Sequence, residues 1–144
     1  MTSQEQIERA LQRALDAHLG QRDRAGAPYI LHPLHLMFQC LDDPDAMVVA
    51  LLHDTVEDSP LTLDDLRVDG FPSHIVEAVD AMTRRPHESY EAFVARAGGD
   101  PLARRVKQVD IEHNLDLRRL DELGPKDIER LQRYHSALRA LHAK

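Results

Sequence analysis

The sequence predicts an all-α, single-domain bundle of about seven to nine helices. Apolar residues recur at spacings of three and four over most of the chain, which is the period of one buried helical face. No segment shows the regular apolar and polar alternation of a half-buried strand. The chain has 144 residues, of which 42% are hydrophobic. That length and composition suit one domain with a substantial core.

Glycine, proline and capping residues mark the first expected boundaries. Ser3 and Gln6 have the spacing of a capping box and open the first helix. Gly20 suits the end of that helix. Residues 21–31 are expected to form a loop, because glycine and proline interrupt the helical pattern there.

A second helix is expected to have Pro33 in its first turn and to run to about Leu41. Residues 42–44 read Asp-Asp-Pro and break the chain. A third and mostly apolar helix is expected to start at about Asp45 and to continue through His53.

Further helices are expected in the C-terminal half, each after a capping residue, a proline or a glycine. Their starts are expected near Thr62, Pro72, Ser89, Asp100 and Gly124. Asp100 followed by proline is a strong helix start, because aspartate caps free N–H groups and proline suits the first turn.

Charge and cysteine content exclude several classes of protein. The net charge is −7 and the basic residues are scattered, which argues against a nucleic-acid polymer as partner. A small phosphorylated ligand needs only a few local cations. The single cysteine, Cys40, allows no intrachain disulfide and fits a reducing compartment. Residues 1–5 are too polar for a signal peptide, and no apolar run is long enough for a bilayer, so a cytoplasmic protein without a membrane partner is expected.

Residues 51–58 hold one histidine and three carboxylates at the end of an apolar run. On a continuous helix, His53 lies over Glu57 and Asp54 lies over Asp58. Carboxylates this close repel each other unless a cation lies between them. The segment therefore indicates a divalent metal, and the spare carboxylates beside it suggest hydrolysis.

Three blocks, residues 26–33, 51–58 and 106–114, occur in an order and at a spacing that resemble the hydrolase domain of the RelA/SpoT alarmone enzymes. That domain is a branch of the HD superfamily. The likeness also covers residues 76–84. Because no synthetase domain follows, residues 1–144 are expected to be a free-standing, single HD-type phosphohydrolase domain, similar to a small alarmone hydrolase.

The resemblance implies an all-helical, HD-type bundle that binds one divalent ion, usually Mn²⁺. It also implies removal of the 3′-pyrophosphate from ppGpp and pppGpp, which gives GDP or GTP and pyrophosphate. The positions that match the metal ligands are His32, His53, Asp54 and Asp110. The family's catalytic Glu-Asp pair matches Glu57 and Asp58.

Two imidazoles and two carboxylates suit manganese, iron, cobalt or zinc better than calcium. Glu57 and Asp58 are expected to orient the attacking water and to handle its proton. A pyrophosphate carries several negative charges, so an acidic protein needs local cations beside it. The expected substrate contacts are Arg22, Arg24, Tyr29, Arg84, Lys107 and Asn114.

Two departures from the family pattern concern the substrate. Asp23 and Arg24 stand where the family often has Arg-Lys, and residues 110–117 lack the family's arginine and threonine. The substrate could therefore be another 3′-phosphorylated nucleotide, such as an adenosine analogue, or a phosphomonoester. A non-hydrolytic nucleotide sensor is a further alternative, although Glu57 and Asp58 favour an enzyme. A homo-oligomer is possible, but no exposed seam indicates one.

Each motif residue also has a purely structural explanation. His32 could cap a helix, Asn114 could end one, and Asp110 could be an exposed acid. Their occurrence together in the three blocks favours the functional interpretation. Outside these positions, His18 is expected on the surface and His113 in a contact between helices.

Overall fold

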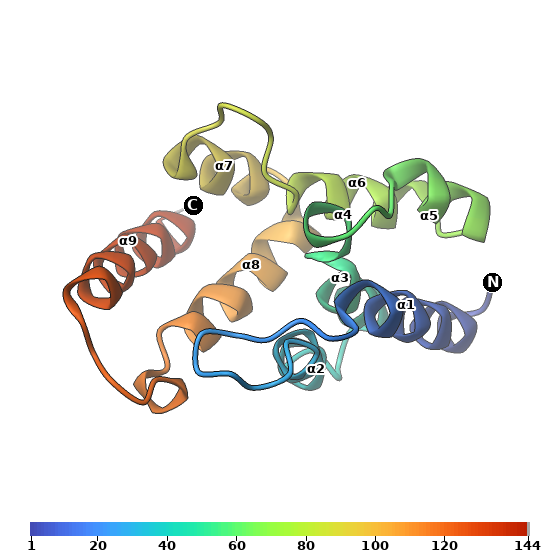
Figure 1. Ribbon diagram of the computed structural model, residues 1–144. Coiled ribbons are helices and arrows are strands. Elements are labelled where there is room, and N and C mark those ends of the chain that lie inside the picture. Colours follow the sequence, from blue (N-terminus) through green and yellow to red (C-terminus); the bar gives the residue numbers. More distant parts are fainter. Residues whose placement is uncertain (144) are drawn as a thin grey trace.

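Nine α-helices and one 3-10 helix make up the secondary structure of residues 1–143, the part of the chain that the computed structural model describes (Figure 1). Within these residues no strand forms, and a single isolated bridge joins Arg22 to Pro28. The prediction of an all-α bundle is confirmed. The elements are α1 (Ser3–His18), α2 (Leu31–Phe38), α3 (Pro44–Leu52), α4 (Thr55–Asp58), α5 (Leu63–Asp69), α6 (Ser73–Ala81), α7 (Tyr90–Gly98), α8 (Pro101–Asn114), η1 (Leu117–Arg119) and α9 (Pro125–His142).

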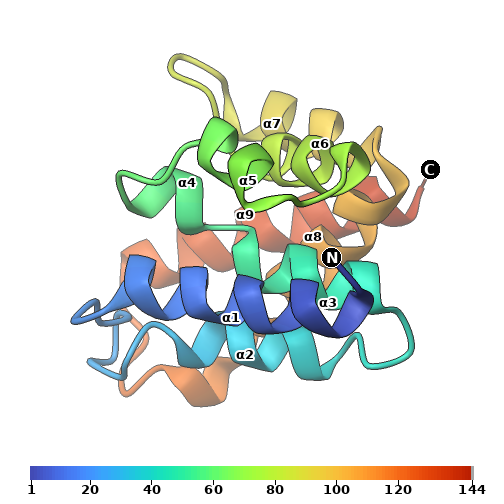
Figure 2. The same cartoon turned by 90° about the vertical axis from the view of Figure 1, so that its right-hand side faces the viewer.

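Helix α8 runs through the middle of the molecule, between α3 on one side and α9 on the other (Figure 1). The main core lies where α1, α2, α3, α6 and α8 meet. Helix α3 is apolar all round and almost fully buried, as expected for a helix enclosed by its neighbours. A smaller apolar cluster joins α7, α8 and α9. Figure 2 shows α1 next to α3, which α2 also contacts, with α5 and α6 side by side above them.

The first capping box lies one residue earlier than predicted. Thr2 Oγ1 accepts a hydrogen bond from the backbone N–H of Glu5 (3.1 Å), and Glu5 Oε2 accepts one from the N–H of Thr2 (2.7 Å). Thr2 with Glu5 has the same spacing as Ser3 with Gln6, so the spacing alone could not separate the two pairs. The predicted starts near Thr62 and Asp100 are confirmed, because each side chain accepts hydrogen bonds from backbone N–H groups of the first turn.

The predicted continuous helix through residues 51–58 is wrong. Helix α3 ends at Leu52, the chain turns at His53 and Asp54, and α4 begins at Thr55. The Thr55 hydroxyl donates to the carbonyl of Leu52 (2.8 Å), and this bond satisfies an acceptor that the helix end leaves free. His53 and Glu57 therefore do not share one helical face. The second helix spans Leu31–Phe38, so Pro33 lies in its first turn as predicted, but the helix ends before Leu41.

His18, expected on the surface, is buried with 2% of its surface exposed, and its Nδ1 lies 2.8 Å from Gln21 Oε1. Among the helices formed by residues 1–143, none combines the length and the hydropathy required to span a bilayer.

Candidate metal centre and adjacent pocket

His32, His53 and Asp110 come from three different segments and meet in the interior. His32 lies in the first turn of α2, His53 directly follows α3, and Asp110 lies in α8. One ligand atom of each residue lies within 4.8 Å of those of the other two. His32 Nε2 is 2.8 Å from Asp110 Oδ1, and His53 Nε2 is 3.7 Å from the same oxygen. All three side chains are buried, so the cluster is held by the core.

The orientation of the His53 ring is fixed by the backbone. Its Nδ1 lies 2.6 Å from the carbonyl oxygen of Ala50. A carbonyl only accepts, so Nδ1 carries the hydrogen and Nε2 faces the carboxylates. Nε2 lies 3.0 Å from Asp54 Oδ2 but makes no well-aligned hydrogen bond. A buried ring nitrogen without such a bond, set among carboxylates, fits a position that ligates a cation.

Asp54 lies at the edge of this cluster. Its Oδ2 accepts a very short hydrogen bond from the phenol of Tyr29 and lies 3.0 Å from His53 Nε2. It is not one of the three residues whose ligand atoms are mutually close. The structure thus brings together three of the four predicted metal ligands and places the fourth beside His53. Its role as a ligand stays a prediction.

The charged groups around the cluster favour the binding of a cation there. Burial alone would raise the pKa of Asp110, but the Lys107 ammonium, the hydrogen bond from His32 and the charge of the nearby His53 hold it well below its usual range. Burial would lower the pKa of His53, yet the Asp54 and Asp110 carboxylates raise it well above its usual value. A proton and a metal ion therefore compete for the same nitrogen. Two imidazoles with buried carboxylates fit a divalent transition metal.

Lys107 is buried, contrary to what a phosphate contact would require. Its ammonium lies 3.0 Å from Asp110 Oδ2 and 4.5 Å from the centre of the Phe93 ring. Only 8% of its side-chain surface is exposed. The ammonium thus faces a metal-ligand candidate and an aromatic ring of α7. A direct contact of Lys107 with substrate stays a prediction that this geometry does not support.

A polar pocket of about 310 Å³ opens next to the cluster. Four of the predicted substrate contacts line it: Arg22, Arg24, Tyr29 and Asn114. Asn114 connects the pocket to the cluster, because its Nδ2 donates to Asp110 Oδ1 (3.2 Å). The pocket therefore places guanidinium groups beside the candidate metal ligands.

The pocket also contains residues that the sequence did not single out. These are Arg119 of η1, together with Arg130 and Tyr134 of α9. Arg130 and Tyr134 are four residues apart and so share one helical face. That spacing was visible, but nothing in the sequence showed that α9 folds back against the loop before α2.

Glu57 and Asp58 lie on α4 at the solvent-exposed rim of the cluster. Glu57 Oε1 accepts a hydrogen bond from the backbone N–H of Arg84 (2.9 Å), which ties α4 to the segment after α6. The Arg84 guanidinium donates to the carbonyl of Glu88 (3.1 Å) and does not line the pocket. Partial desolvation, with the charges of Asp54 and Glu57, raises the pKa of Asp58 to about 6.

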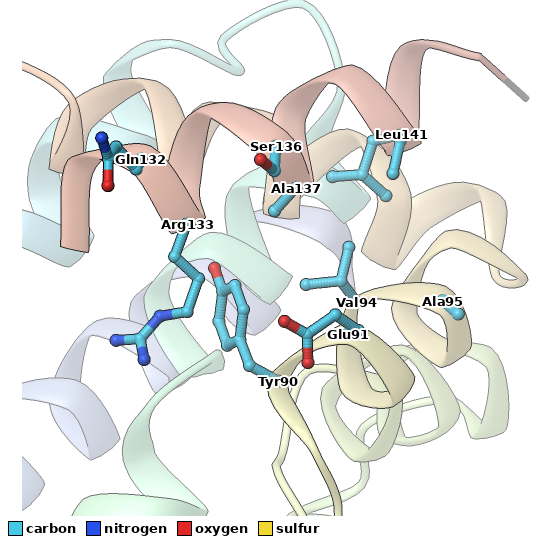
Figure 3. A pocket seen from close by; sticks show the side chains of 10 residues that line it. Tyr90, Glu91, Val94, Ala95, Gln132, Arg133, Ser136, Ala137 and Leu141 are labelled. Carbon is cyan, nitrogen blue, oxygen red and sulfur yellow. The ribbon is translucent and has the colours of Figure 1, made fainter. Parts of the chain in front are cut away.

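A second crevice, of about 410 Å³, lies between α7 and α9. Figure 3 shows Tyr90 of α7 next to Arg133 of α9, whose guanidinium carbon is 5.2 Å from the centre of the phenol ring. Its lining is mostly apolar and contains neither His32, His53 nor Asp110. The candidate chemistry therefore belongs to the pocket beside Asn114.

Comparison with known proteins gives relatives of much greater length. No protein-family model matches the chain. A GTP pyrophosphokinase of Streptomyces coelicolor is 36% identical over 122 residues, which are 76% of this chain and 14% of that protein. Guanosine-3′,5′-bis(diphosphate) 3′-pyrophosphohydrolases of Aquifex aeolicus and Haemophilus influenzae are 28% and 30% identical, over 78% and 82% of this chain. The chain spans between 14% and 19% of the length of these three relatives.

One solved structure shares the fold. It is described as a metazoan orthologue of SpoT that hydrolyses ppGpp, and it superposes with a TM-score of 0.78 at 21% sequence identity. The match covers 94% of this chain and 84% of that one. The helical arrangement is thus shared over almost the whole chain.

Proposed function

This chain is an HD-type hydrolase domain of the RelA/SpoT family, and from that premise we propose that it removes the 3′-pyrophosphate of ppGpp and pppGpp. The products are GDP or GTP and pyrophosphate. The observation that carries the proposal is the convergence of His32, His53 and Asp110 beside a pocket lined with arginines. The names of the aligned pyrophosphohydrolases support this substrate.

We propose Mn²⁺ as the metal, held by His32, His53 and Asp110, with Asp54 as the fourth ligand. A divalent ion in such a site polarises a phosphoryl oxygen and lowers the pKa of water. The His53 ring is already oriented for this role by Ala50, and the Tyr29 phenol holds the Asp54 carboxylate. The protein thus supplies an oriented ligand set before any ion binds.

Glu57 and Asp58 act on the attacking water. A carboxylate with a pKa of about 6 is largely ionised at neutral pH and can still accept a proton during the reaction. Asp58 takes a proton from the water molecule as the water oxygen bonds to the 3′-phosphorus. The bond from that phosphorus to the ribose O3′ breaks, and O3′ takes up a proton. Glu57 holds the rim in place through its bond to the Arg84 backbone.

The arginines of the pocket balance the charge of the nucleotide. The chain as a whole carries a net charge of −7, so a polyphosphate needs a local positive region to bind. Arg22, Arg24 and Arg130 supply it at one mouth. Two of these arginines already form ion pairs, because Arg24 and Arg130 both contact Asp127, at 3.1 Å and 3.2 Å.

A second candidate substrate rests on Asp23. This residue stands at a position where the family often has a basic side chain, and here its carboxylate accepts hydrogen bonds from the N–H groups of Ala25 and Ala27 (3.0 Å and 2.9 Å). It shapes the loop that borders the pocket. Another 3′-phosphorylated nucleotide, such as an adenosine analogue, is therefore the alternative substrate.

The test is a panel of nucleotides incubated with purified protein and Mn²⁺. The panel contains ppGpp, pppGpp, the adenosine analogue and a 3′-phosphomonoester. Release of pyrophosphate from the guanosine alarmones supports the proposal. Release of orthophosphate would assign a phosphomonoesterase, and binding without any product would assign a sensor. The Asp58→Asn protein serves as the control for contaminating hydrolases.

A further inference from the structure

Arg119 connects the 3-10 helix η1 to the end of α8. Its Nη1 donates to Asn114 Oδ1 (3.1 Å) and to the backbone carbonyl of His113 (3.2 Å). Its Nη2 lies 3.8 Å from Asp23 Oδ2. The side chain is 23% exposed and lines the pocket. Arg119 therefore touches a pocket residue that also contacts the metal-ligand cluster.

The two neighbours of Asn114 allow only one orientation of its amide. Oδ1 accepts from the Arg119 guanidinium, and Nδ2 donates to Asp110 Oδ1 (3.2 Å). A guanidinium has only donors and an ionised carboxylate has only acceptors. A reversed amide would set N–H against N–H on one side and oxygen against oxygen on the other. Arg119 and Asp110 thus fix an orientation that is usually ambiguous for asparagine.

The fixed orientation leaves a donor for a ligand. An asparagine amide nitrogen carries two N–H groups. Among residues 1–143 the structure shows one acceptor for Nδ2, the Asp110 carboxylate. Because Asn114 also lines the pocket, its second N–H can donate to an oxygen of a bound nucleotide.

We infer that Arg119 is a positioning residue for nucleotide binding: it locks the Asn114 amide so that Nδ2 faces both Asp110 and the pocket. This inference rests on the proposed hydrolysis of a nucleotide in that pocket. Arg119 acts through Asn114, so its effect requires the asparagine side chain. A direct phosphate contact would instead be independent of Asn114.

The kinetic test is a double-mutant cycle with Arg119→Met and Asn114→Ala. Arg119→Met should raise KM for ppGpp on the order of tenfold, the effect of one lost charge-assisted hydrogen bond, and change kcat much less. In the Asn114→Ala background the same substitution should have little further effect. The matched control is Arg118→Met, because Arg118 is 89% exposed and contacts only the adjacent Asp116 in the described chain. Equal effects of Arg119→Met in both backgrounds would overturn the inference.

A second readout does not depend on turnover. In the ligand-free wild-type protein, the two side-chain N–H signals of Asn114 should be separate and slow to exchange with solvent in NMR spectra. Arg119→Met should shift these signals and speed their exchange, whereas Arg118→Met should leave them unchanged. Unaltered signals in Arg119→Met would show that Arg119 does not hold the amide. If the wild-type protein hydrolysed no alarmone, the proposed function would fail while this measurement still decided the role of Arg119.

Discussion

The ammonium of Lys107 lies 3.0 Å from Asp110 Oδ2, one helical turn away on α8, and both side chains are buried. Asp110 Oδ1 faces His32 Nε2 at 2.8 Å. One carboxylate oxygen is thus paired with a fixed cation, while the other points into the candidate metal centre. Lys107 offsets the charge of Asp110 and fixes its direction, which is a different role from contacting a phosphate.

Replacement of Lys107 by methionine should destabilise the metal-free protein. Removing one partner of a buried ion pair leaves the other charge uncompensated and costs about 3–5 kcal/mol. Urea denaturation of both proteins with a chelator present measures this difference. Added Mn²⁺ should recover part of the loss, because the ion supplies positive charge to Asp110. Equal stability of the two proteins would mean that the pair contributes nothing to the fold.

The Asp58→Asn variant should lose turnover and keep its affinity for metal. Asparagine has nearly the same shape as aspartate but cannot take a proton from water. Asp58 lies on the rim rather than in the cluster of His32, His53 and Asp110. Rates of pyrophosphate release and calorimetric Mn²⁺ titrations of the same preparation separate the two properties. Turnover at the wild-type rate would remove Asp58 from the mechanism.

The protein should become less stable in acid because the carboxylate of Asp69, which joins α5 to α1, takes up a proton. Its carboxylate accepts hydrogen bonds from Arg13 Nε (2.7 Å) and from Arg9 Nη2 (2.9 Å). The Arg13 hydrogen bond, with a smaller share from Arg9, outweighs burial and lowers the pKa of Asp69. A lowered pKa stabilises the fold above the unfolded-state pKa, and the effect is lost as pH falls through the folded-state value.

The Asp69→Asn protein should therefore be less stable than the wild type by about 2 kcal/mol at pH 7. The gap should begin to narrow as pH drops below about 4, where the carboxylate of the unfolded chain takes up a proton. It should close only below the lowered pKa of Asp69 in the folded protein. Denaturation midpoints recorded from pH 7 to pH 3 measure this. The exposed Asp64 provides the control, and Asp64→Asn should change stability little at any pH. A gap that stays constant with pH would mean that packing, not charge, links the two helices.

The Tyr29→Phe variant tests how Asp54 is held. The phenol donates a hydrogen bond to Asp54 Oδ2, and the neighbouring His53 Nε2 is 3.0 Å from the same oxygen. Loss of the hydroxyl frees the carboxylate, so Mn²⁺ affinity should fall about 10- to 100-fold, the usual effect of removing an outer partner of a metal ligand. Calorimetric titration measures it, and unchanged affinity would place Asp54 outside the ligand set.

The cluster could be predicted from the sequence because its members lie in short blocks that occur in a fixed order. Each block predicts at least one metal ligand. Three of these ligands, His32, His53 and Asp110, lie together in the fold. The break at His53 could not be predicted from periodicity, because the apolar pattern of α3 runs up to Leu52 without a proline or glycine. At that end the Thr55 hydroxyl donates to the carbonyl of Leu52, and such a side-chain to backbone bond competes locally with the helical pattern.

Burial of charged groups could not be predicted from the sequence. Lys107 is predicted as a substrate contact because it lies about one helical turn before Asp110 and can lean toward the site. Its pairing with Asp110 could have been inferred from their spacing of three residues, but not its burial against Phe93 of α7. Arg119, Arg130 and Tyr134 depend on how the chain returns after α8. No local pattern in residues 115–134 specifies that return.

The most direct measurement is the anomalous-difference density of crystals grown with Mn²⁺. One peak per chain is expected, within roughly 2.0–2.3 Å of His32 Nε2, His53 Nε2 and an Asp110 carboxylate oxygen. The His53→Ala protein, treated in the same way, should show no peak at that position. A peak bound elsewhere, or no peak in the wild-type crystals, would contradict the claim that these side chains form one metal centre.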